Sequence, residues 1–527
     1  MDEMLELNTV NWLLAFSPLF VLLVTMIGLK WSAPRAGTGA WIVALLGGWL
    51  FFGADGFILG IACAKGLSLS LFVLLIIWAA VYMYNLIERL GGIEVIGKSI
   101  TGLVKSRLGQ ALLLAWVFSG FVQGIAGFGV PVAIVTPLML MLGFPPIMAA
   151  ASVLVGHAWA VTFGSMGSSY YTIQLVTGIP GSTIGPTMAI LFALPIVASG
   201  FGVAIITGGW QNARKGALAI LTIGIVVSFF VWLMAFLGAA QIASIVPGLV
   251  GCGMVLLLSK TSLLGSKLGG GAAPDSQASG NRLSFHMAFL PYYLLILLTV
   301  VSQIPALKEA ARHLYLGVNY PGLETSLGHV VEPAKAYAKI RLLNHPAPLI
   351  LAATFLTFLV FRSTGRWRSG TGVAALKTTI RQCIPTSLSI ATMVMMALIM
   401  TNTGMTEILA HGIARVTGVV FPVFSPYIGV LGCFMTGSNT NSNVMFGALQ
   451  METAISLGIS PVIIASIQSI GGSLGSAIAP AKVLIGSTVV GLAGGREGEV
   501  MRKAIPYCLV IVFLVGLEAW LASYIFS

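Results

Sequence analysis

The stretch Gln123-Gly124-Ile125-Ala126-Gly127-Phe128-Gly129-Val130-Pro131 is rich in glycine and partly polar, yet it lies within a long apolar region of the chain. A second polar stretch, Gly437-Ser438-Asn439-Thr440-Asn441-Ser442-Asn443, lies in a similar setting. Each leads through an apolar run to a matching landmark, since Gly143 and Pro146 recur as Gly458 and Pro461 at a constant offset of 315 residues. Helix-breaking residues at membrane depth are tolerated only where the backbone is buried in protein or lines a cavity. Two such breaks at corresponding places indicate the substrate site of a transporter.

The composition around these stretches is that of a membrane protein. The chain has 527 residues, of which 57% are hydrophobic and only 8% are charged, whereas soluble domains carry roughly a quarter charged residues. We therefore predict a multi-pass protein of the inner (plasma) membrane. The net charge of +12 comes from basic residues in short loops, which are topology signals, so no nucleic-acid partner is expected.

No motif for catalysis, nucleotide binding or metal binding occurs in the sequence. The five cysteines lie in or beside apolar segments, and none forms a metal-binding spacing. We therefore expect no enzyme activity, no cofactor and no metal site.

A membrane span needs about 20 apolar residues, and twelve segments of the chain qualify. Two further apolar stretches, 110–142 and 419–457, contain the polar breaks, and we interpret each as a re-entrant hairpin. The predicted fold is an all-α polytopic membrane protein with about 12 transmembrane helices plus two re-entrant hairpins. The twelve spans are predicted near 10–29, 39–63, 66–87, 145–169, 185–210, 216–236, 239–258, 286–303, 346–362, 384–403, 461–480 and 505–526.

The distribution of basic residues orients these segments. With the N-terminus outside and both hairpins re-entrant, most lysines and arginines fall on the inside, as the positive-inside rule requires. An odd number of spans then separates the hairpins, so the repeat is predicted to be inverted. The predicted parts are an N-terminal half (1–268), a cytoplasmic linker (269–284) and a C-terminal half (285–527). An external loop, 304–345, is expected to contain an amphipathic helix over 306–316.

The breaks supply the candidate substrate-binding residues. Glycines free the backbone, and helices that restart there present N–H groups and partial positive charge to an anion. Hydroxyls and amides in the second break add hydrogen-bonding groups without charge. For Gly471 and Gly472 in the next span, close helix packing explains the residue type equally well. The candidates are Gln123, Gly124, Gly127, Phe128, Gly129, Ser165, Gly167, Ser438, Asn439, Thr440, Ser442 and Asn443.

Four ionisable residues within apolar segments are candidates for neutralising the substrate or carrying a proton. Lys482 follows the second break and could neutralise a carboxylate, although a lysine that snorkels to the inner surface is the alternative. His157 lies within a span and could carry a proton, or it could be a hydrogen-bonded structural histidine. Asp55 and Glu518 are interpreted as boundary or packing groups.

The same residues resemble the bacterial L-lactate permease family. The match lies in Gly124-x-x-Gly127-Phe128-Gly129-x-Pro131, in Phe163-Gly164-x-Met166-Gly167, and in Phe434-x-Thr436-Gly437-Ser438-x-Thr440 with Ser442-Asn443, and the layout of spans agrees over essentially the whole chain. The resemblance implies import of L-lactate, D-lactate, glycolate and related 2-hydroxy monocarboxylates by proton symport. Ser438-Asn439-Thr440 is also similar to a triplet of the wider ion-transporter superfamily, which implies alternating access by an elevator-type motion.

The sequence departs from that family pattern at three positions. Gln123 and Asn439 stand where acids are expected, and Lys482 stands where a small polar residue is expected. A glutamine cannot carry a proton, so we hypothesise that Lys482 or His157 takes over charge compensation and is the candidate for proton coupling, or that the substrate is more anionic. Sodium-coupled carboxylate transport is the first alternative function, and an anion channel is a weaker one. The expected partners are a small carboxylate, a proton or sodium ion and the bilayer, and a homodimer is left open.

Overall fold

The computed structural model of the chain describes residues 8–101, 103–127, 129–264, 283–310, 312–492 and 496–525. Phe128 and residues 269–282 of the predicted linker lie outside this part. Within the described residues, 11 helices are long and apolar enough to cross a membrane, or up to 12 if one bent pair counts as a span. The predicted polytopic helical fold with about 12 spans is therefore confirmed.

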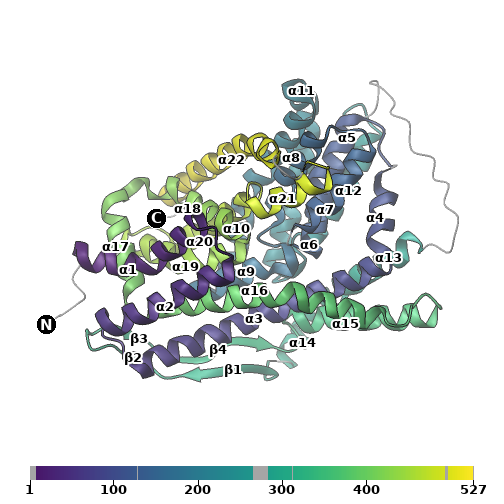
Figure 1. Ribbon diagram of the computed structural model, residues 1–527. Coiled ribbons are helices and arrows are strands. Elements are labelled where there is room, and N and C mark those ends of the chain that lie inside the picture. The colour runs from purple at the N-terminus through teal and green to yellow at the C-terminus, as the bar shows by residue number, and fades with distance from the viewer. Residues whose placement is uncertain are drawn as a thin grey trace.

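One group of helices, which we call the scaffold layer, packs along the lower part of Figure 1. α16 contacts both α2 and α3 along its length, and α15 joins α3 to α13. Both halves of the sequence contribute to this layer, so the predicted halves do not correspond to its boundaries. The layer comprises α2 (Ala33–Phe51), α3 (Gly56–Arg89), α13 (Phe285–Ser302), α15 (Pro346–Ser363) and α16 (Thr371–Asn402).

The remaining long helices form a second group, which we call the hairpin layer, with α18, α20 and α22 packed together and α8 packed on α11 and α22. α1 (Thr9–Leu23) packs on α2 and α17, and α4 (Gly92–Thr101) packs on α13. The hairpin layer comprises α5 (Arg107–Ala111), a π-helical segment (Leu112–Phe118), α6 (Ser119–Ile125), α7 (Val130–Met141), α8 (Pro146–Gly156), α9 (Gly164–Thr177), α10 (Gly181–Leu191), α11 (Ala193–Phe236), α12 (Ile245–Ser259), α17 (Met405–Thr417), α18 (Phe421–Thr436), α19 (Asn439–Ser456), α20 (Pro461–Gly475), α21 (Pro480–Val489) and α22 (Glu497–Ile525).

One predicted span boundary is wrong and another is shifted by a few residues, and glycine explains both. The predicted span 39–63 is divided, because Gly53 adopts φ 64° and Asp55 caps α3 by accepting a 2.8 Å hydrogen bond from the Ile58 N–H. This places Asp55 at a boundary, as predicted. The boundary expected between 210 and 216 lies a few residues earlier: α11 breaks at Gly208 and Gly209, and a Cβ at Gly224 would lie 2.7 Å from Val197, so the two segments of α11 fold back on each other.

The loop 304–345 folds into strands, so the predicted amphipathic helix over 306–316 is wrong. α14 (Pro305–Ala310) is short, and the tyrosine- and valine-bearing sequence after it favours extended structure. β1 (Tyr315–Tyr320) pairs antiparallel with β4 (Ala334–Arg341), and β2 (Leu323–Glu324) pairs antiparallel with β3 (Val330–Val331). These strands lie beneath the scaffold layer in Figure 1.

The hairpin layer contains the same packing contact twice. A Cβ at Gly156 of α8 would overlap the carbonyl oxygen of Ala115, and a Cβ at Gly471 of α20 would overlap that of Pro426. Gly156 and Gly471 are 315 residues apart, the offset already seen in the sequence. In both halves, therefore, the helix after the polar break crosses the helix before it with only a glycine between the backbones. Re-entry of the hairpins and inversion of the repeat remain predictions.

The Gly471→Ala variant should be strongly destabilised, because its methyl group meets backbone that cannot rotate away. Overpacking of this kind costs roughly 1–3 kcal/mol. Gly60→Ala is the matched control, since Gly60 lies in α3 with nothing within 4 Å of the added methyl group. Thermal unfolding of the purified proteins in detergent should show a lower midpoint for Gly471→Ala only; equal midpoints would contradict the close crossing.

Candidate substrate-binding site

Four interruptions of helices lie in the hairpin layer, one at each hairpin tip and one in the helix that follows each hairpin. Gly129 (φ 85°) precedes α7, and Gly437 (φ 70°) ends α18. Ser438 then caps α19 by accepting a 3.3 Å bond from the Asn441 N–H. The second pair of breaks separates α8 from α9, which are bent by 50°, and α20 from α21. Glycine and capping side chains thus produce the interruptions that the sequence predicts.

The tip of the second hairpin is hydrogen-bonded to the break between α8 and α9 and to α20. The Asn439 amide donates to Thr162 Oγ1 at 2.9 Å and to the Ser469 carbonyl at 3.1 Å. Ser473 Oγ in turn donates to the Ala158 carbonyl at 2.6 Å. These bonds bring the break between α8 and α9 against α19 and α20.

The next turn of α19 continues the same hydrogen-bond network. Asn443 donates to the Ser169 carbonyl at 3.0 Å and to Ser469 Oγ at 2.9 Å. Thr440 and Ser169 share a hydrogen bond between their hydroxyls at 3.0 Å. The side-chain oxygens Oδ1 of Asn439 and Asn443 are buried and have no hydrogen-bond partner among the described residues.

The first break carries a second, smaller polar cluster. The Gln123 side chain lies beside Gly164, where an added Cβ would approach its Nε2 to 2.8 Å, and Ser165 Oγ lies against Gly127. Gln123 Oε1 is buried without a partner in the described part of the chain. Ser165, Met166 and Gly167 all adopt positive φ, a conformation that costs roughly 1–3 kcal/mol at each non-glycine position and is concentrated at functional sites.

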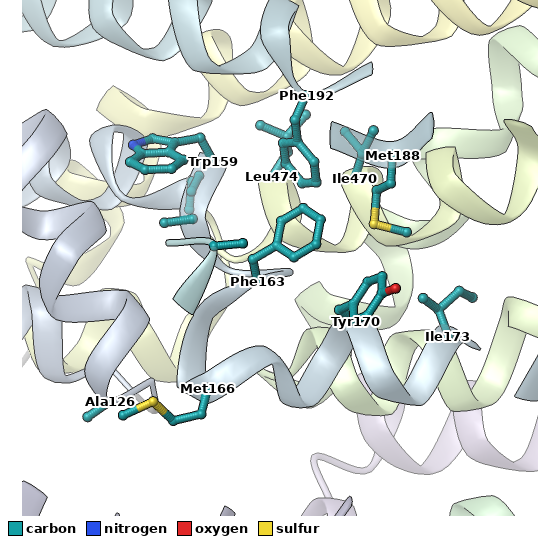
Figure 2. Close-up of a cluster of buried hydrophobic side chains, with 14 of the residues drawn as sticks. Ala126, Trp159, Phe163, Met166, Tyr170, Ile173, Met188, Phe192, Ile470 and Leu474 are labelled. Atoms are coloured by element: carbon teal, nitrogen blue, oxygen red, sulfur yellow. The ribbon is translucent and has the colours of Figure 1, made fainter. Parts of the chain in front are cut away.

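Apolar side chains surround this break. Figure 2 shows Phe163 between Phe192 and Tyr170, and the ring centroids lie 5.9 Å and 5.3 Å away. Trp159 and Leu474 are also fully buried nearby. Polar groups in such surroundings are poorly screened, so each hydrogen bond and charge in the break has a larger energetic effect than in water.

Lys482 supplies the cation of the site. It lies in the first turn of α21 and is only 5% exposed, so it does not snorkel to the surface. Its Nζ donates to Ser476 Oγ at 2.9 Å, and among the described residues no carboxylate pairs with it. Both hairpin tips contact this helix, since a Cβ at Gly437 would lie 3.4 Å from Ala481 and Gly129 abuts Ile485.

His157 is joined to Lys482 through the Ser476 hydroxyl. Its Nδ1 lies 2.7 Å from the Val153 carbonyl, and its Nε2 lies 3.4 Å from Ser476 Oγ. Because a carbonyl can only accept, the proton belongs on Nδ1, and Nε2 accepts from Ser476. The histidine is thus a buried, hydrogen-bonded neighbour of the cation.

Some predicted site residues face helix contacts instead of the polar clusters. A Cβ at Gly124 would lie 2.8 Å from Ile245, and Ser442 Oγ donates to the Gly429 carbonyl at 2.8 Å in the crossing with α18. Gly472, by contrast, leaves room for the Asn439 side chain. Gly471 therefore allows close packing of two helices, whereas Gly472 lies beside the candidate site.

Sequence reasoning missed Thr162 and Ser469 and did not include Ser473 and Ser476 among the site residues. The repeat offset of 315 residues could have identified Ser473, because it relates Ser473 to Ala158 and the two residues are hydrogen-bonded. No comparable signal marks Thr162 or Ser469, because a single hydroxyl in an apolar segment is also common at ordinary helix contacts.

Comparison with known proteins identifies the family of the chain. The family model described as L-lactate permease matches residues 11–526. The chain belongs to the L-lactate permease family. Membership in this family, together with the many apolar helices, identifies a multi-pass inner-membrane protein of a transporter family.

Named relatives in the L-lactate permease family align along most of the chain. The L-lactate permease of Bacillus subtilis is 29% identical, covering 86% of this chain and 85% of that protein. The L-lactate permease and the glycolate permease GlcA of Escherichia coli K12 are 27% and 28% identical, each covering 86% of this chain and 84% of that protein. Among solved structures, the YdaH transporter of Alcanivorax borkumensis aligns with a TM-score of 0.47 at 16% identity, covering 88% of this chain and 87% of that one.

Substitution of Lys482 by methionine should leave stability unchanged or raise it. A buried ammonium with one hydroxyl acceptor has lost most of its hydration, and replacing buried charge with apolar groups can stabilise by roughly 1–4 kcal/mol. Lys377→Met, at an exposed position of α16, is the control and should be near neutral. Thermal unfolding in detergent without carboxylate anions tests this expectation. If the midpoint of Lys482→Met falls as far as that of Gly471→Ala, Lys482 contributes to the stability of the fold.

Proposed function

We propose that the protein is a secondary active transporter that imports small 2-hydroxy monocarboxylates, namely L-lactate, D-lactate and glycolate. The observation that carries this proposal is Lys482, a buried cation without an anionic partner beside a network of amides and hydroxyls in an L-lactate permease family member. A carboxylate placed against its Nζ would receive a charge-assisted hydrogen bond. The start of α21 adds the partial positive charge of a helix N-terminus.

The 2-hydroxyl group has partners close by. Asn439 Oδ1 lies against Gly472, one helical turn before Ser476. Asn443 donates to Ser469, two turns before Ser476, so both amides lie on the face of α20 that carries the hydroxyl partner of the lysine. Their free Oδ1 atoms can accept the substrate hydroxyl proton. Lactate and glycolate differ only by a methyl group, and both carry the carboxylate and hydroxyl that such a site would bind.

Transport itself would require the hairpin layer to move against the scaffold layer. The contact between the layers includes α9 on α3 and α19 on α16, with Asn441 donating to Ser389 Oγ at 3.0 Å. Few polar bonds need to break at such an apolar contact. We propose that the substrate site travels with the hairpin layer in an elevator-type alternating-access cycle.

His157 is the proposed proton acceptor for symport. A substrate anion beside Lys482 adds negative charge near His157, and this favours the charged imidazolium. By linkage, a proton on His157 favours anion binding to the same extent. Gln123 and Asn439 cannot take this part, since neither side chain ionises near neutral pH.

The Lys482→Gln variant should lose uptake of labelled L-lactate in proteoliposomes. Removing one partner of a buried charge pair costs roughly 2–5 kcal/mol, which is more than a tenfold loss of affinity. Lys377→Gln, at the exposed position used above, should transport at the rate of the unchanged protein. Unchanged L-lactate uptake by Lys482→Gln would exclude Lys482 as the anion site.

Sodium coupling is the second candidate, and the buried amide oxygens favour it. Asn439 Oδ1 and Asn443 Oδ1 are one helical turn apart and unpartnered, and oxygen atoms are the ligands that hard cations prefer.

Separate ion gradients distinguish the two forms of coupling. Under the leading proposal, an inward proton gradient drives L-lactate accumulation in proteoliposomes and a sodium gradient at constant pH does not. Accumulation driven by sodium alone would reverse the assignment. Currents far above carrier turnover, without accumulation against a gradient, would indicate an anion channel.

A further inference from the structure

A cleft of about 660 Å³ lies between the two layers, next to the strands of residues 315–341. The hairpin layer contributes Tyr170, Tyr171 and Gln174 of α9 to its wall. The other wall belongs to the scaffold layer and its attached strands, and includes Lys339 and Arg341 of β4. The cleft therefore lies where the layers meet, and its strand-bearing mouth is on the face that the sequence predicts to be external.

The wall of this cleft is cationic. Lys339 and Arg341 are lining residues, and no aspartate or glutamate of the described ranges lines the cleft. Lys339 Nζ lies 3.6 Å from the centre of the Tyr315 ring, and no carboxylate among the described residues pairs with either cation. His345 adds no charge near neutral pH, because burial lowers its pKa to about 4 while its Nε2 faces the Phe72 carbonyl at 3.2 Å.

The strands that carry these charges are fixed to the scaffold layer. Tyr320 of β1 donates to the Ala64 carbonyl at 2.9 Å, and the Ser326 N–H donates to the Gly53 carbonyl at 2.9 Å. After β4, Asn344 donates to the Ser302 carbonyl at 2.8 Å. The two cations are therefore held at the mouth of the cleft by bonds on both sides of β4.

The opposite wall leads to the candidate substrate site. Tyr170 and Tyr171 directly follow Ser169, which is hydrogen-bonded to Thr440 and Asn443. Tyr171 donates to Gln241 Oε1 at 2.8 Å, while Gln241 Nε2 is buried without a partner. The tyrosines thus line the cleft and directly adjoin, along α9, a residue of the polar network.

We propose that this cleft is the external vestibule of the transporter, in which Lys339 and Arg341 capture the substrate carboxylate before it passes Tyr171 to the site at Lys482. The inference rests on the proposed function and adds a capture site to it. A cleft with charge of one sign and low-dielectric walls concentrates the oppositely charged ligand and raises its association rate. The effect weakens as salt screens the charges.

The test is the initial rate of L-lactate uptake into right-side-out vesicles by the Lys339→Gln/Arg341→Gln double variant. At low ionic strength we expect its KM to rise roughly three- to tenfold with kcat unchanged, because steering acts on association. At high salt the KM of the unchanged protein should approach that of the variant. The charge-conserving variant Lys339→Arg/Arg341→Lys should retain the low KM.

Lys335→Gln is the matched control, since Lys335 lies on the same strand but does not line the cleft. An unchanged KM in the double variant, or an equal rise in Lys335→Gln, would overturn the vestibule while leaving the proposed function intact. If the proposed function itself is wrong, the unchanged protein will take up no more L-lactate than the Lys482→Gln variant. That result would overturn the vestibule as well, and it differs from an unchanged KM in a protein that does transport L-lactate.

Discussion

A helix that stops inside a membrane leaves backbone N–H and C=O groups that water cannot reach, and each must find a partner within the protein. Here side chains of the second hairpin and of the helix after it supply hydrogen-bond partners for the break between α8 and α9. Ser473 satisfies the Ala158 carbonyl and Asn443 satisfies the Ser169 carbonyl, so groups from one half of the chain complete the breaks of the other half. The fold and the candidate site therefore depend on the same set of hydrogen bonds.

That arrangement concentrates polarity in a place that is otherwise apolar. Among the described residues, Lys482 has a hydroxyl partner and no counter-ion. A charge in that position costs folding free energy unless a ligand neutralises it. Under the proposed function, Lys482 links stability to anion binding, and His157, joined to it through Ser476, links both to protonation.

The sequence predicted those parts of the fold that depend on residue type at a break or a span. Gly129 precedes one helix, and Gly437 with Ser438 begins another, because positive φ and capping are local properties. It failed where partners distant in the sequence decide the structure. The strands β1 and β4 are set by pairing across the loop, and Thr162 gains significance only from Asn439, which is 277 residues away. Gly471 and Gly472 could be told apart only by the atoms that each glycine faces.

In the proposed function, the substrate carboxylate binds Lys482 at the junction of the two breaks. An experimental structure of the protein with bound L-lactate tests it most directly. The account predicts the carboxylate within about 3 Å of Lys482 Nζ and the 2-hydroxyl against the amides of Asn439 or Asn443. L-lactate seated in the hairpin layer without contact to Lys482 would contradict it.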